Sequence, residues 1–150
     1  MYLESPVKMK KIVASHSEKD IKEELMKEKI LVVDDDVLMA QMIKLTLERT
    51  CNYEVRVETD ALNAVSVART FKPKLILLDI IMKNLGGEDI ACIIKEDREL
   101  SHIKIVFLSA LLTKDEIGGL GKKIGRFWFL AKPVTDDELL SVIDRKLGMR

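Results

Sequence analysis

The chain has 150 residues, 47% of them hydrophobic and 33% charged, which is typical of one soluble globular domain. Basic and acidic residues number 25 each, so the formal net charge is zero and gives no support to a nucleic-acid or membrane surface. No apolar run approaches the roughly 20 residues that span a bilayer, and no signal peptide is recognisable. Cys51 and Cys92 suggest neither a disulfide framework nor a metal site, so a cytoplasmic location is expected.

Residues 1–28 differ in pattern from the rest and are predicted to form an N-terminal extension. Ser17 followed by Asp20 resembles a helix N-terminus, and a short helix would place Ile21 and Leu25 on one face. That apolar stripe is thin, so we expect a loosely docked helix or a flexible arm. A partner-binding role for the extension is the less favoured alternative.

Five short apolar segments predict strands, and most of them end in a polar residue. They are 29–33, 54–57, 74–78, 103–108 and 127–130. Residues 30–33 and 75–78 are unbroken runs of Ile, Leu and Val, and 103–108 is interrupted only by Lys104, as expected for strands covered on both faces of a parallel sheet. The alternating segment 54–57 suits a strand nearer the sheet edge. The polar residues that follow the other strands are Asp34, Asp35 and Asp36, then Asp79, Ser109 and Lys132.

Helical periodicity fills the intervals between the strands. The predicted helices are 38–49, 60–70, 88–97, 113–124 and a last one from the capping box at Thr135 to just before Gly148. Met39, Met42 and Ile93 are assigned to buried helix faces. The segment 84–87 is a predicted turn whose glycines supply positive φ. Three glycines weaken the fourth helix, at positions 118, 119 and 121, so it should be short, frayed or mobile.

Five βα units with short connections predict a doubly wound, largely parallel five-stranded sheet with helices on both faces. Ligands of such sheets bind beyond the carboxyl ends of the strands. The strand-end residues should therefore meet there: Asp34, Asp35, Asp79, Ser109 and Lys132. Carboxylates suit Mg²⁺, a lysine can neutralise phosphate oxygens, and Asp79 is placed to act as a nucleophile. The plainer alternative is an acidic turn that only caps the first helix.

Over residues 29–148 the chain resembles the receiver domain of two-component response regulators. The resemblance rests on the acidic triplet after the first strand, Leu-Leu-Asp79-Ile-Ile-Met82, Leu-Ser109-Ala110 and Lys132-Pro133. It implies a flavodoxin-like fold with strand order 2-1-3-4-5. It also implies Asp79 as phosphoacceptor and a Mg²⁺ or Mn²⁺ ion bound by Asp35, Asp79 and the backbone carbonyl of Ile81, with Asp34 acting through water. Lys132 would then pair with the phosphoryl oxygens, leaving Asp36 to cap the first helix.

The resemblance also implies a switch in which Ser109 moves toward the phosphoryl group and Phe129 turns inward. A histidine kinase or phosphotransfer protein would be the donor, and the face formed by 113–147 would contact a protein target. Such a domain catalyses only its own phosphorylation and dephosphorylation. Because only three residues follow Leu147, we expect a stand-alone receiver without an output domain. Apolar Ile81 suggests slow loss of the phosphoryl group.

Three positions depart from the usual receiver pattern. Lys83 follows Met82 where proline is frequent, Gly86 precedes Gly87 where aspartate is usual, and the fourth helix is rich in glycine. None of these departures touches the residues predicted to carry the chemistry.

Two alternatives remain open at this point. A haloacid-dehalogenase-like phosphatase would use the triplet, Ser109, Lys132 and the later pair Asp136-Asp137, but that assignment leaves Asp79 without a role. A degenerate receiver would bind partners without being phosphorylated. His16 and His102 are interpreted as surface residues, and neither is expected to transfer phosphate.

Overall fold

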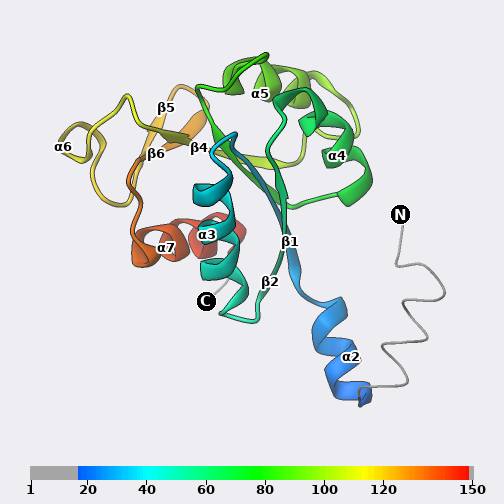
Figure 1. Ribbon diagram of the computed structural model, residues 1–150. Helices are drawn as coiled ribbons and strands as arrows, with labels where there is room; N and C mark the ends of the chain where they lie inside the picture. Colours follow the sequence, from blue (N-terminus) through cyan, green and yellow to red (C-terminus); the bar gives the residue numbers. More distant parts are fainter. Residues whose placement is uncertain (1–16, 149–150) are drawn as a thin grey trace.

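The computed structural model describes residues 17–148, and one six-stranded sheet organises them in the order β2-β1-β3-β4-β6-β5 (Figure 1). The strands are β1 (Glu28–Val33), β2 (Tyr53–Glu58), β3 (Leu75–Asp79), β4 (Lys104–Ser109), β5 (Lys122–Ile124) and β6 (Phe127–Ala131). The helices are α2 (Glu18–Leu25), α3 (Val37–Glu48), the 3₁₀ turn η1 (Ala61–Asn63), α4 (Ala64–Phe71), α5 (Gly87–Glu96), α6 (Lys114–Ile117) and α7 (Asp136–Leu147).

The five expected strands are parallel and follow the expected order, with β6 as the fifth. Strand β2 is at one edge, as its alternating pattern predicted. At the other edge β5 pairs antiparallel with β6 and is an addition to the predicted sheet. The doubly wound fold is therefore confirmed, with one extra edge strand.

Each face of the sheet is covered by its own pair of helices. Alternate residues of the central strands, such as Ile30 and Val32, pack with α3 and α7, while Leu31 and Val33 pack with α4 and α5. In Figure 1 these two helix pairs lie on opposite sides of the strands. Because side chains alternate across a strand, a strand buried on both faces must be apolar throughout, and the runs in β1 and β3 have that pattern.

The predicted helix over 113–124 is correct only for its first turn. Helix α6 ends at Ile117, and the chain turns through Gly118 and Gly121, whose φ angles are +80° and +78°. Residues 122–124 then form β5, which the two-residue turn at Gly125 joins to β6. Positive φ is compatible with glycine but not with a continuing α-helix, so the glycines divert the chain into a hairpin.

Two side chains assigned to buried helix faces are exposed instead. Met42 is 58% exposed and Ile93 is 44% exposed, whereas Met39 packs partly against the core. In α3 the buried positions include Ala40, Ile43 and Leu47, so the buried face is centred one position away from Met42.

The turn before α5 also differs from its prediction. The residue with positive φ is Asn84, at +73°, and neither glycine of the turn adopts it. Gly87 is required for space, since a Cβ there would lie 2.2 Å from the carbonyl oxygen of Asp79.

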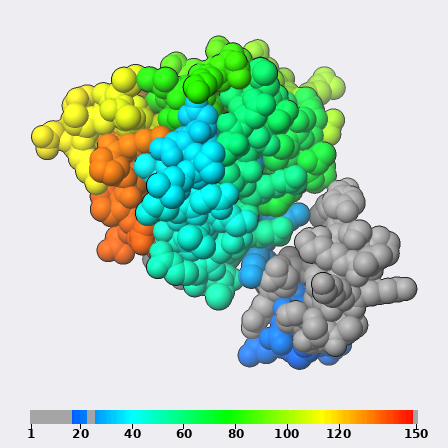
Figure 2. Space-filling model, viewed as in Figure 1, coloured from blue at the N-terminus to red at the C-terminus, as the bar shows by residue number. Residues whose placement is uncertain are grey.

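Helix α2 confirms the predicted short helix in the N-terminal extension, and in Figure 2 it projects away from the body of the domain. Ser17 and Asp20 form the expected cap: the backbone N–H of Asp20 donates to Ser17 Oγ, and Ser17 donates back to the Asp20 carboxylate. The side chain of Leu25 and all of residues 1–16, including His16, lie outside what the structure describes. Among the described helices, none has the length and apolarity needed to cross a membrane.

Candidate functional site

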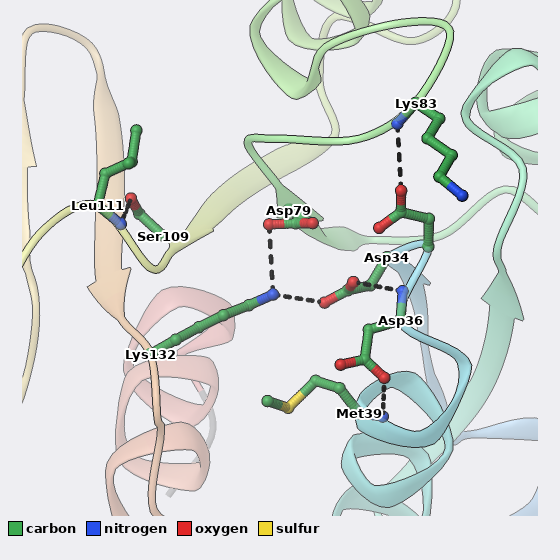
Figure 3. Close-up of polar contacts among 9 residues, drawn as sticks. Asp34, Asp36, Met39, Asp79, Lys83, Ser109, Leu111 and Lys132 are labelled. Atoms are coloured by element: carbon green, nitrogen blue, oxygen red, sulfur yellow. Dashed lines mark hydrogen bonds and ion pairs between the residues drawn. The ribbon is translucent and has the colours of Figure 1, made fainter.

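Four strand ends bring the predicted polar residues to one edge of the sheet. Asp34 follows β1, Asp79 and Ser109 are the last residues of β3 and β4, and Lys132 follows β6. Figure 3 shows the Lys132 side chain reaching across to Asp79 and Asp34. The convergence expected from parallel topology is therefore observed.

The ammonium group of Lys132 bridges two carboxylates. Its Nζ lies 2.8 Å from Oδ2 of Asp34 and 3.3 Å from Oδ1 of Asp79. The side chain of Asp34 is completely buried and that of Asp79 is 10% exposed. Burying an unpaired carboxylate costs free energy of folding, because the charge loses its hydration. The Lys132 ammonium offsets this cost for Asp34 and Asp79.

The three consecutive aspartates have three different roles in the local structure. Asp34 Oδ1 accepts a hydrogen bond from the backbone N–H of Asp36 at 2.9 Å, which fixes the carboxylate against its own loop. Asp35 Oδ2 accepts from the backbone N–H of Lys83 at 3.1 Å, so it ties the loop after β1 to the loop after β3. Asp36 Oδ1 accepts from the N–H of Met39 and caps α3, as predicted. The capping alternative thus holds for one carboxylate of the three.

Asp34, Asp35 and Asp79 each offer a carboxylate oxygen within 4.8 Å of the other two. This set is the candidate metal site within the described part of the chain. An all-oxygen, acidic set with one half-exposed member suits a hard divalent cation that keeps some of its waters, such as Mg²⁺ or Mn²⁺. The chemistry of the donors therefore fits the ion that the sequence predicted.

The electrostatics of the site act most strongly on Asp79. Burial and the neighbouring Asp34 carboxylate raise the pKa of Asp79 from 3.8 to about 6, against the opposing effect of Lys132. Burial acts to lower the pKa of Lys132, but the hydrogen bond and charge of Asp34, together with Asp79, raise it overall. Negative charge is thus crowded around Asp79, and an added cation would relieve it.

Ser109 and Phe129 are near the site but do not belong to the charged cluster. The buried Ser109 hydroxyl accepts a hydrogen bond from the backbone N–H of Leu111 at 3.0 Å. Phe129 stacks on Phe107 with ring centroids 5.0 Å apart, and Phe127 meets the same ring edge-on at 5.1 Å. Both candidate switch residues therefore have partners that they would leave if they moved.

Sequence reasoning missed the backbone contacts that shape the site. The amides of Lys83 and Leu111 hold Asp35 and Ser109, and Gly87 allows the α5 loop to approach Asp79. Backbone amides leave no signature in residue type, so the first two had no signal. The glycine pair after β3 was a signal, but it was interpreted as a source of positive φ and not as a requirement for space.

The later acidic pair does not join the cluster. Asp136 accepts hydrogen bonds from Thr46 and Arg49 at the start of α7. The phosphatase alternative required an acidic residue from this pair beside the triplet, and the geometry gives it no support.

The fold and the site together define a doubly wound α/β domain with paired carboxylates and a lysine at its strand ends. The family model for the response regulator receiver domain matches residues 30–144. The chain belongs to the response regulator receiver family of two-component signalling.

The probable transcriptional regulator ycf29 of Pyropia yezoensis is 31% identical over 124 residues, which are 82% of this chain and 54% of that protein. The DNA-binding response regulator MtrA of Mycobacterium leprae is 30% identical over 122 residues, which are 81% and 52% of the two chains. This chain thus spans about half the length of the curated relatives it matches.

Two solved structures share the fold over nearly all of their length. The signal receiver domain of a DNA-binding response regulator from Colwellia psychrerythraea aligns with a TM-score of 0.68 at 23% identity, covering 82% of this chain and 100% of that one. A response regulator from Desulfuromonas acetoxidans gives 0.66 at 26% identity, covering 81% and 97%.

Proposed function

We propose that Asp79 accepts a phosphoryl group from a partner histidine kinase or phosphotransfer protein, and that the modified receiver signals through a conformational change. The observation that supports this most strongly is the surrounding of one carboxylate by two others and a lysine. Asp34, Asp35 and Asp79 each offer a carboxylate oxygen within 4.8 Å of the other two, so their negative charges repel one another and favour a bound cation. A phosphoryl-transfer site needs this combination of nucleophile, metal ligands and cation.

In this proposal a carboxylate oxygen of Asp79 attacks the phosphorus of a phosphohistidine in line with the leaving nitrogen. The P–N bond breaks, a P–O bond forms, and the departing imidazole nitrogen keeps the electron pair and takes up a proton. Lys132 moves from Asp34 toward the new phosphoryl oxygens and balances their charge. Its present position between the two carboxylates makes that move short.

We assign the metal ligands to Asp35, Asp79 and the backbone carbonyl of Ile81, with Asp34 acting through water. When bound, Mg²⁺ would neutralise phosphoryl oxygens and lower the repulsion between the donor and the acidic cluster. Asp35 is suited to direct contact because it is the less buried of the first two aspartates. Asp34 is already held by Lys132 and by the amide of Asp36.

The switch would begin at Ser109. A phosphoryl group adds a charge of about −1.5 to −2 and strong acceptor oxygens, to which the Ser109 O–H could donate if the side chain turned toward them. If Ser109 turns toward Asp79, its bond to the Leu111 amide is lost and the β4–α6 loop must rearrange. Phe129 then has to repack against Phe107, which carries the change to the face formed by 113–147.

This chain has an apolar surface next to the site, on which the proposed donor would dock. Leu38, Met42 and Leu45 are exposed by 71%, 58% and 63%, and their spacing places them along one face of α3. This helix begins directly after the acidic triplet, so a protein docked on it would reach Asp79. We propose that the receiver acts as an independent unit, with the donor on α3 and a protein target on the 113–147 face.

The proposal is tested by intact-mass analysis after incubation with acetyl phosphate and Mg²⁺. The wild-type protein should gain one phosphoryl group, and Asp79→Ala should gain none. Asp89→Ala is the matched control, because this exposed aspartate lies in the first turn of α5, outside the charged cluster, and its loss should leave the gain unchanged.

Three results would count against the proposal. A degenerate receiver would show no mass gain, a gain that persists in Asp79→Ala would place the acceptor elsewhere, and repeated turnover of a phosphate monoester would favour a phosphatase.

A further inference from the structure

A strongly basic pocket lies at the end of the sheet opposite the acidic site. Its volume is about 540 Å³, and it opens where β4 and β6 begin, whereas the aspartates follow the ends of their strands. Six basic side chains line it: Lys95, Lys104, Lys123, Arg126, Arg145 and Lys146. Its other lining residues are Ile105, Phe127 and Trp128, so no carboxylate is among them.

This concentration of positive charge is not compensated within the described residues. Basic and acidic residues are equal in number over the whole chain, yet none of these six forms an ion pair with a carboxylate in residues 17–148. Six like charges around one cavity repel one another, and an anion is the simplest group that relieves them.

Neutral carbonyl groups hold several of these cations in place without removing their charge. Lys95 Nζ donates to the carbonyls of Ser101 and Ile103 at 3.1 and 2.6 Å, and Lys104 Nζ donates to that of Lys146. Arg145 donates to the carbonyl of Leu120 at 3.2 Å. An ammonium has three donors and a guanidinium five, so each of these groups keeps N–H donors for a ligand.

The two aromatic residues position cations rather than offering a free surface for stacking. Lys146 Nζ lies 3.8 Å and the Arg145 guanidinium carbon 5.0 Å from the centroid of the Trp128 ring. Arg126 lies 5.1 Å from that of Phe127. Cation–π contacts of this kind order long side chains that would otherwise be free. A ligand would therefore be recognised by its charge more than by a ring.

Titration within the pocket agrees with this description. Burial, followed by the charges of Arg145, Lys123 and Lys104, lowers the pKa of Lys146. Burial, followed by Arg126, lowers that of Lys95. The two shifts have the direction expected for cations that crowd one another without a counter-ion.

The β5–β6 hairpin supplies four of the lining residues: Lys123 from the unexpected strand β5, Arg126 from the turn, and Phe127 and Trp128 from the expected strand β6. Without it the cavity would lack one wall. The hairpin thus builds a feature that the regular βα pattern does not contain.

We propose that this pocket binds a compact polyanion with two or more linked phosphate groups, either an inorganic polyphosphate or the polyphosphate part of a nucleotide. The volume falls within the roughly 300–1,000 Å³ range of small-molecule sites. A single phosphate would reach only some of the six cations, whereas a chain of phosphates can contact several at once.

The test is calorimetric titration of the full-length chain with tripolyphosphate at about 0.15 M ionic strength, where surface charges are screened. EDTA is present, so that no metal links the ligand to the aspartates. Lys123→Gln/Arg126→Gln should weaken binding by at least about tenfold, because the two changes remove two of the six positive charges that line the pocket. Lys122→Gln/Arg98→Gln removes the same two residue types from outside the pocket and should change affinity by less than about twofold.

Titrations with further ligands distinguish inorganic polyphosphate from a nucleotide, and both from other anions. Equal affinity for tripolyphosphate and for a nucleoside triphosphate supports recognition by charge, and tighter nucleotide binding identifies the nucleotide as the source. Orthophosphate should bind at least about tenfold more weakly. The proposal is overturned if tripolyphosphate does not bind, if its affinity equals that of orthophosphate, or if the two double variants weaken binding equally. Tighter binding of an acidic peptide or of duplex DNA would overturn it as well. Asp79→Asn should not affect this binding, so the result is independent of the phosphorylation proposal.

Discussion

The ammonium nitrogen of Lys132 lies 2.8 Å from Oδ2 of Asp34, although Lys132 and Asp34 are 98 positions apart in the chain. Its distance to Oδ1 of Asp79, the candidate phosphoacceptor, is longer, at 3.3 Å. This cation stabilises the acidic cluster, in addition to its proposed role in binding phosphoryl oxygens. Lys132→Ala should therefore destabilise the protein by about 3 kcal/mol, because it leaves the buried carboxylates of Asp34 and Asp79 without their cation. Urea unfolding in EDTA measures the change.

Lys114→Ala is the control for that variant. Lys114 pairs with Glu138 at 2.7 Å, but its side chain is 36% exposed, so the loss should stay below about 1 kcal/mol. Equal losses for the two variants would mean that the cluster does not depend on Lys132. Added Mg²⁺ should recover part of the stability lost in Lys132→Ala only.

The raised pKa of Asp79 predicts a specific pH dependence of stability. Because its pKa is about 6 in the folded protein and 3.8 ordinarily, the folded state retains a proton between these values that the unfolded state has lost. The stability due to this carboxyl is thus fully present below pH 3.8 and is lost as pH rises through about 6.

Asp79→Asn should accordingly be more stable than the wild type at pH 7 in EDTA, by up to about 3 kcal/mol, and the difference should shrink toward pH 4. Denaturant unfolding across this range gives the comparison. A difference that stays constant with pH would show that the carboxyl titrates normally.

Gly87 tests the close packing behind the phosphoacceptor. In Gly87→Ala the new Cβ would meet the carbonyl oxygen of Asp79 at 2.2 Å, so the loop must shift. We expect a loss of about 2 kcal/mol and slower phosphorylation by acetyl phosphate.

Gly86→Ala is the neighbouring control, since its Cβ would have no contact closer than 3.6 Å. It should cost less than about 1 kcal/mol and leave the phosphorylation rate nearly unchanged. Similar rates in both variants would contradict the steric argument.

Gly121, just before β5, is a second position at which a side chain would clash with neighbouring atoms. Its φ is +78°, and a Cβ would lie 2.4 Å from Nε1 of Trp128 and 2.5 Å from the carbonyl oxygen of Phe129. Gly121→Ala should cost about 3 kcal/mol and change the emission of Trp128, the single tryptophan of the chain.

Gly125→Ala, at φ +63° with no atom within 4 Å, should cost about 1 kcal/mol from backbone strain alone and leave the emission unchanged. If this control perturbed Trp128 as strongly as Gly121→Ala, the clash would not be the cause.

The side chain of Ile81 leads to a prediction about how fast phospho-Asp79 would lose its phosphoryl group. This side chain is 60% exposed at the rim and cannot hydrogen-bond an attacking water. We expect phospho-Asp79 to be long-lived, and Ile81→Asn to hasten its loss about tenfold by orienting water. The decay is followed by intact mass, with Leu62→Asn as the exposed apolar control elsewhere. A wild-type lifetime of seconds would refute this prediction.

Much of the core could be predicted because its signals are local. The unbroken runs of β1, β3 and β4 identified buried strands, and the regular βα order then required a parallel sheet whose polar strand ends meet. Two features had no such signal. Strand β5 consists of exposed residues, so only its pairing with β6 makes it a strand, and the burial of α3 depended on a rotation that periodicity could not resolve between Met39 and Met42.

The residues that gather at the acidic site could be identified from the amino-acid order alone, because strand direction places Asp34, Asp79, Ser109 and Lys132 at one edge whatever the details of packing. Their bonding partners could not be identified in this way. Side-chain distances between segments far apart in the chain depend on how helices and loops pack, and this packing placed Lys132 against Asp34 and the amide of Lys83 against Asp35. The same packing folded 122–128 back as a hairpin and brought six cations around one pocket, a concentration of charge that the balanced composition does not reveal.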